Sequence, residues 1–252
     1  MRPHHLLAAA FLASEAPELA AQDAAPKWSV GAIGLYEASP FAAEGSELEA
    51  FPFVAYRGER FFIEGPMLGY RLTTEDNSDT DELELEVSII AAMRTLPGES
   101  RNKITADIGI IAELETALGE FELMALHDAT DTSNGIEVSA EYSRDIQFGK
   151  LVVTPSVEVA WQSRKLTNYL WGVTTEQNAK MISDNKTILP VYTPNSDTWV
   201  VETNIMARYQ LAQQWMLVGL AGVEFLGSTV TDNPGINKDH IFEAGLGLTY
   251  SF

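Results

Sequence analysis

Carboxylate side chains recur along this chain in a spacing that could do chemistry. Glu82, Glu84 and Glu86, for example, alternate with Leu83 and Leu85. Because successive side chains of a β-strand point to opposite faces, this spacing gathers the carboxylates on one face. A concave wall of one charge sign focuses electrostatic potential and concentrates ions of the opposite sign. The spacing therefore predicts a surface that attracts cations.

The same alternation recurs in later segments and predicts an acidic inner wall, opposed by Lys150 and Arg208. Such a wall would attract cationic solutes such as polyamines or aminoglycosides. Two plainer explanations stay open: the acids could solvate a plugged interior, or they could reflect a saline habitat. The carboxylates expected to point inward are Glu82, Glu84, Glu86, Asp107, Glu113, Glu120, Glu122, Glu137, Glu141, Glu158, Glu202, Glu224 and Glu243.

The acidic run 75–82 could supply oxygen ligands to Ca²⁺. It lacks the glycine and the terminal glutamate spacing of a known calcium loop, so a solvated turn is the better interpretation. We predict no metal site and no cofactor.

An enzyme would need a histidine beside a nucleophile. Outside the first residues of the chain, the histidines are His127 and His240. Ser143 and Ser228 are conceivable partners, but no spacing pairs them with a histidine and no Gly-x-Ser-x-Gly elbow is present. We therefore interpret the histidines as surface residues and do not predict an enzyme.

The elements that would carry the carboxylates are long alternating strands. Segments 150–162 and 198–211 alternate apolar with polar or small residues over a dozen positions or more. A tilted strand of this length spans a bilayer, and closure is needed because an open edge in lipid leaves backbone groups unpaired. The pattern favours an all-β transmembrane antiparallel up-and-down barrel over a soluble sandwich.

The strand number should be even, because both ends of a bacterial barrel chain lie on the periplasmic side. The turn signal Gly65-Pro66 divides 60–74 into a short hairpin and gives twelve strands; ten is the alternative. Long connections at 175–196 and 228–239 would then face outside. The expected strands are 27–37, 48–58, 60–65, 67–74, 82–94, 103–114, 118–128, 135–147, 149–162, 197–211, 213–227 and 240–252.

Composition narrows the class of protein. Sixteen Lys and Arg oppose 36 Asp and Glu, a formal net charge of -20, which argues against nucleic acid as a partner. Cysteine is absent, which excludes disulfides, thiolate metal sites and thiol nucleophiles. No apolar run approaches the roughly 18 residues of a membrane-spanning helix.

The two ends of the chain suggest export. A basic start, a short apolar core and small residues near Ala21 predict a cleaved signal peptide at 1–21, with a disordered tail as the alternative. The barrel would then occupy 22–252. In the final segment, Tyr250 and Phe252 lie on the apolar face, which resembles the terminal strand that serves outer-membrane barrels as an assembly signal.

The blocks 51–70, 151–173 and 245–252, taken in order, resemble the MipA/OmpV family of outer-membrane proteins. The resemblance implies a barrel in the bacterial cell outer membrane without a catalytic motif. It also implies a scaffold that binds a murein transglycosylase or synthase. Membrane lipid and the barrel-assembly machinery would be further partners. The alternative function is a narrow cation-favouring channel or a barrel that binds cationic solutes.

Overall fold

The computed structural model describes residues 26–73, 83–95 and 104–252, and in these residues one antiparallel sheet contains thirteen labelled strands. Three short helices lie in the connections: α2 (Arg164–Trp171), α3 (Thr175–Ser183) and α4 (Ser228–Thr231). None of the described helices is long and apolar enough to cross a membrane. The strands are β1 (Trp28–Glu37), β2 (Glu47–Arg57), β3 (Phe61–Glu64), β4 (Met67–Arg71), β5 (Leu83–Thr95), β6 (Ile104–Thr116), β7 (Gly119–Asp128), β8 (Ile136–Ser143), β9 (Ile146–Phe148), β10 (Leu151–Gln162), β11 (Thr198–Ala212), β12 (Trp215–Phe225) and β13 (His240–Ser251).

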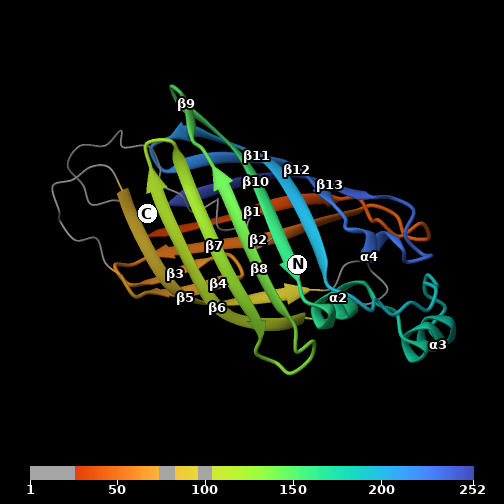
Figure 1. The fold of residues 1–252 in the computed structure, drawn as a ribbon. Helices are drawn as coiled ribbons and strands as arrows, with labels where there is room; N and C mark the ends of the chain where they lie inside the picture. Colours follow the sequence, from red (N-terminus) through yellow and green to blue (C-terminus); the bar gives the residue numbers. More distant parts are fainter. Residues whose placement is uncertain (1–25, 74–82, 96–103) are drawn as a thin grey trace.

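The sheet closes into a barrel (Figure 1). Each strand pairs with its sequence neighbour, and β1 pairs with β13 to join the two ends of the sheet. Because β8 and β9 both pair with β10, they are two parts of one wall strand. The barrel therefore has twelve strands, which confirms the expected number and the even parity.

The short hairpin predicted at Gly65-Pro66 is confirmed. Glu64 faces Met67 across a two-residue turn, and Gly65 has a φ of 54°. A two-residue hairpin turn requires this left-handed conformation, which glycine adopts without steric cost.

Segment 135–147, predicted as one strand, is interrupted at Arg144 and Asp145. The Arg144 N–H donates to the carbonyl of Pro155 on the neighbouring β10 over 3.2 Å. The N–H and C=O of one strand residue point to the same neighbour, so the missing N–H of Pro155 falls at this break. Proline inside a sheet is tolerated where the ladder is interrupted, which explains the position of the break.

Apolar side chains cover the outside of the barrel. Leu123, Ile205 and Leu246 are each more than half exposed, as residues that face lipid would be. Aromatic pairs such as Trp28–Tyr56 and Trp215–Tyr250, with ring centroids 4.6 and 5.0 Å apart, gather near one end of the wall. This arrangement is a barrel's apolar belt with an interfacial girdle.

The two ends of the barrel differ in their connections. The turn end, as we call it, contains both barrel termini and the short connections 58–60, 117–118, 149–150 and 213–214. The loop end contains the longer connections 38–46, 129–135, 163–197 and 226–239. The tight connections 149–150 and 213–214 lie on the side of the termini and the long connections 163–197 and 226–239 on the other side, as expected from the sequence.

Candidate functional site

The strand register brings seven glutamates into one row on the inner wall. Directly paired residues of adjacent antiparallel strands point to the same face, with Cβ atoms about 5 Å apart. Each member of the row directly faces the next across a strand boundary. This carboxylate ladder consists of Glu86, Glu113, Glu122, Glu141, Glu158, Glu202 and Glu224.

The ladder climbs along the barrel. Glu86 lies three residues from the turn end of β5, whereas Glu224 lies one residue from the loop end of β12. Barrel strands are tilted, so a row that follows their hydrogen bonds winds around the wall and rises along the axis. Glu243, Glu37 and Glu47 then continue the path at the loop end: Glu243 is a diagonal neighbour of Glu224, and the three face one another in turn.

The middle of the ladder is buried. Glu141 and Glu158 are 6% and 5% exposed, and in the described part of the chain one oxygen of each has no hydrogen-bond partner. Two ionised carboxylates at the 5 Å or so that separates the Cβ atoms of facing residues would repel by about 3 kcal/mol at an effective dielectric constant of about 20. Such a row is stable only if protons, cationic side chains or bound cations offset this repulsion.

Two apolar clusters line the interior near opposite ends of the ladder. The first includes Phe62, Ile90 and Ile111 and lies on the loop-end side of Glu86 and Glu113. The second, formed by Phe53, Ala55, Met206 and Val218, lies on the turn-end side of Glu202 and Glu224. Apolar side chains therefore lie beside the two ends of the ladder, whereas its middle does not border either cluster.

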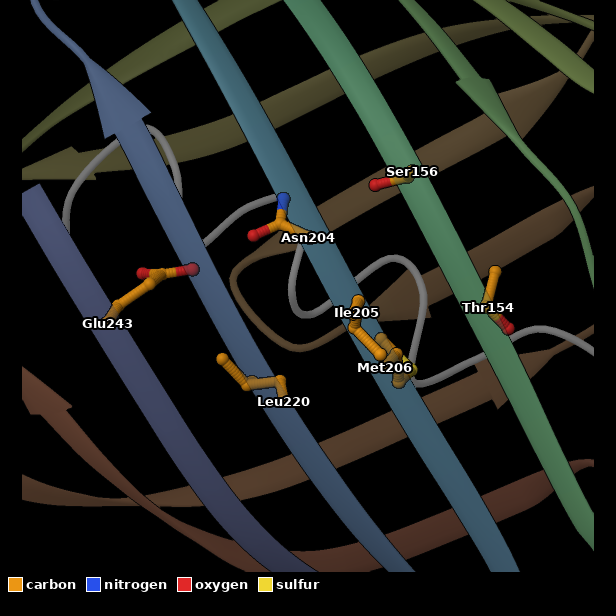
Figure 2. Close-up of a pocket in the computed structure, with 7 residues that line it drawn as sticks. All are labelled: Thr154, Ser156, Asn204, Ile205, Met206, Leu220 and Glu243. Atoms are coloured by element: carbon orange, nitrogen blue, oxygen red, sulfur yellow. The ribbon is translucent and has the colours of Figure 1, made fainter.

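A small pocket opens beside the middle of the ladder (Figure 2). Asn204 donates from Nδ2 to Glu202 over 2.8 Å, and Ser156 faces Asn204 across the strand boundary. Ser156 is 91% buried, and its hydroxyl has no partner among the described residues. The pocket is lined by Thr154, Ser156, Asn204, Ile205, Met206, Leu220 and Glu243.

Arginines inside the barrel form ion pairs of their own. Arg94 is 1% exposed and contacts Asp107 at 2.5 Å and Glu137 at 3.2 Å. Arg208 contacts Asp145 at 2.5 Å. Lys150, which the sequence placed opposite the acids, instead lies exposed in the turn before β10.

Arg71 on β4 pairs with a ladder member, Glu86, at 2.7 Å. Arg71 and Arg94 were not foreseen as inward cations, because each partner lies on another strand.

The carboxylates expected inside take different positions. Glu120 on β7 is half-buried, whereas Glu84 on β5 is exposed, and both lie near the turn end in a second short row with Glu115. Asp107 and Glu137 belong to the Arg94 network near the loop end. Glu82 and the rest of the acidic run from residue 75, like the proposed signal peptide, lie outside the described residues.

Glu37 and Glu47 were missed in the sequence. Glu37 lies on the same inward face of β1 as Ser29 and Leu35, so the alternation within this strand could have predicted its position. Glu47 lies one residue before the expected start of its strand, and an error in the boundary hid it.

An apolar cap lies at the loop end and contains α2, α3, α4 and the connection 38–46 (Figure 1). Trp171 and Val230 are almost completely buried in it, and Asn233 Nδ2 donates to the Trp171 carbonyl over 2.9 Å. The core residues of the cap are Phe41, Leu166, Leu170, Trp171, Val173, Met181, Leu189, Leu226, Val230, Ile236 and Ile241.

The conceivable catalytic residues do not assemble into a known arrangement. His127 is exposed on the outward face near the loop end of β7, whereas Ser143 is buried on the inward face near Glu120. His240 instead contacts Asp239 at 2.7 Å. In the described ranges, no group of three or more histidines or carboxylates is placed to hold a metal ion.

A family model and several known proteins match this chain. A family model described as "MltA-interacting protein MipA" matches residues 30–252. The MltA-interacting protein of Escherichia coli K12 is 28% identical over 90% of each chain. Outer membrane protein OmpV of Vibrio cholerae is 20% identical over 63% of this chain and 58% of its own. Among solved structures, the translocator domain of autotransporter NalP from Neisseria meningitidis covers 99% of this chain and 96% of its own, at 11% identity and a TM-score of 0.44.

Proposed function

The chain belongs to the MltA-interacting protein MipA family of outer-membrane barrels. We propose that it is a non-catalytic barrel whose acidic lumen favours cations. The carboxylate ladder carries this proposal. Like charges placed directly opposite each other across strands destabilise a sheet. Seven in succession, several of them buried, are therefore better explained by a role in holding positive charge than by solvation alone.

Ion selectivity of the refolded barrel in a planar bilayer tests this proposal. Under a KCl gradient, the reversal potential should show a preference for K⁺ over Cl⁻. The preference should be largest at low salt, because screening shortens the reach of the wall charges. Anion selectivity, or the absence of any conductance, would refute the proposal.

Two variants identify the charges responsible. Glu158→Gln with Glu202→Gln removes two facing ladder charges and should reduce the cation preference. Glu176→Gln removes one exposed charge on α3 and should leave the preference unchanged. If both variants behave alike, the net charge of the protein rather than the ladder sets the selectivity.

A second function is supported by the name of the relative from Escherichia coli. We propose that the turn end docks a murein transglycosylase or synthase, so that the barrel scaffolds peptidoglycan-remodelling enzymes. The connections 58–60 and 149–150 would contribute Arg60 and Lys150 to this contact.

Pull-down from an envelope extract tests the docking proposal. The intact barrel should recover a murein hydrolase, and Arg60→Glu with Lys150→Glu should reduce the yield. The matched change Lys180→Glu with Lys186→Glu alters the same charge at the loop end and should have no effect. Recovery that responds equally to both pairs would contradict docking at the turn end.

A further inference from the structure

We propose that the carboxylate ladder binds a linear aliphatic polyamine, extended along the row with its amines on successive carboxylates. This inference rests on the proposed cation preference and narrows it to one class of solute.

The shape of the row favours an extended ligand over a compact ion. A metal ion such as Ca²⁺ needs six or more oxygens that converge on one point. Ladder residues instead follow one another across strands with Cβ atoms about 5 Å apart, and no described group of three or more converges as a metal site would require. Amines separated by three or four carbons have a similar spacing, so one molecule can meet several carboxylates in turn.

The surfaces near the two ends of the row can contact the carbon segments of such a ligand. An apolar cluster that includes Ile111 lies beside one end of the ladder, and a cluster that includes Met206 lies beside the other end. Methylene groups gain from contact with apolar side chains, whereas a hydrated inorganic ion gains nothing there. Carbon segments that extend toward either end of the ladder would therefore meet apolar side chains.

The centre of the row supplies polar atoms that lack partners. Glu141 Oε2, Glu158 Oε2 and Ser156 Oγ are buried without a hydrogen-bond partner in the part of the chain that the structure describes. Ser156 and Glu158 lie on the same inward face of β10, and Glu158 directly faces Glu141. An ammonium group donates three hydrogen bonds, and buried acceptors of this kind are rarely left unsatisfied.

Calorimetric titration of the full barrel in detergent tests the inference with cations of equal charge and different shape. Spermidine and hexaamminecobalt(III) both carry three positive charges, but only spermidine is extended. At constant ionic strength, spermidine should bind at least about tenfold more tightly, since each added charge-assisted hydrogen bond contributes on this scale. Affinity should also rise from butane-1,4-diamine to spermidine to spermine.

Variants locate the site. Glu141→Gln with Glu158→Gln should weaken spermidine binding by about tenfold or more, and Glu176→Gln on α3 should not. Equal affinity for the two trivalent cations overturns the inference. An unchanged affinity for spermidine in the ladder variant overturns it as well. Because the first comparison uses the unaltered protein, it holds even if the double variant fails to fold. A barrel that is cation-selective but indifferent to shape would retain the proposed function and lose this inference.

Discussion

Arg94 shows how charge inside the barrel is stabilised when a protein partner is available. It donates to Asp107 and to both oxygens of Glu137 while almost completely buried. Arg94→Met would leave two buried carboxylates without their cation. Breaking a buried ion pair by removing one partner costs about 3–5 kcal/mol. We expect a lower urea midpoint for unfolding in detergent, followed by tryptophan fluorescence.

Lys180→Met provides the control for Arg94, because it also removes a cation from an ion pair. Lys180 contacts Asp184 at 2.7 Å on the surface of α3, where solvent screens the attraction. Its urea midpoint should not change measurably. If Arg94→Met also leaves the urea midpoint unchanged, water in the lumen solvates Asp107 and Glu137 as well as Arg94 does, and the ion pairs do not stabilise the barrel.

At the residue scale, the sequence predicted which carboxylates share a face but not which ones meet. Alternation within one strand sets the parity of Glu141 and Glu158, whereas their contact depends on the register between β8 and β10. Arg94 and Glu137 are 43 positions apart in the chain, so no local pattern connects them. A ladder is a property of neighbouring strands, and its recognition required the structure.

At the element scale, we expect the cap to limit access to the lumen from the loop end. Leu170 of α2 is 1% exposed in its core, so Leu170→Asp would bury an unpaired charge and loosen the packing. We expect higher conductance in a planar bilayer and faster proteolysis within 163–197. The barrel itself should keep its folded, heat-modifiable mobility in gel electrophoresis.

Ile182→Asp is the matched control for the cap, because it introduces the same side chain at a position of α3 that is 57% exposed. Conductance and proteolysis should stay as in the unaltered protein. Unchanged conductance in Leu170→Asp would mean that the cap does not limit passage, and the restriction would then lie along the ladder.

At the element scale, long strands were predictable and the cap was not. Apolar alternation is repeated in every long strand, so errors of a few residues at the boundaries did not change the fold. The apolar residues of the cap come from four separate segments and form a core only when these meet. One local signal was present: Thr174 and Gln177 form a capping box that begins α3.

For the whole molecule, closure depends on strands from opposite ends of the chain. β1 pairs with β13 along nine residues, and Ser29 and Ser251 share a side-chain hydrogen bond of 2.8 Å across this seam. Even parity and the Gly65-Pro66 turn predicted twelve strands. The ladder rises along the barrel axis because closure of the sheet staggers each strand relative to its neighbour. This stagger is a property of the whole sheet, so the sequence of one strand does not predict it.

Gly31 on β1 tests how closely the seam must approach. A Cβ at this position would lie 2.3 Å from the carbonyl oxygen of Leu248 on β13, so an alanine would force the two backbones apart. At Gly34 on the same strand, the nearest atom would be 3.8 Å away, an ordinary contact. Gly31→Ala should therefore reduce the fraction of protein that refolds into a heat-modifiable barrel. Gly34→Ala should refold fully, because it also restricts the unfolded chain. Equal refolding of both variants would show that the seam can separate locally without loss of closure.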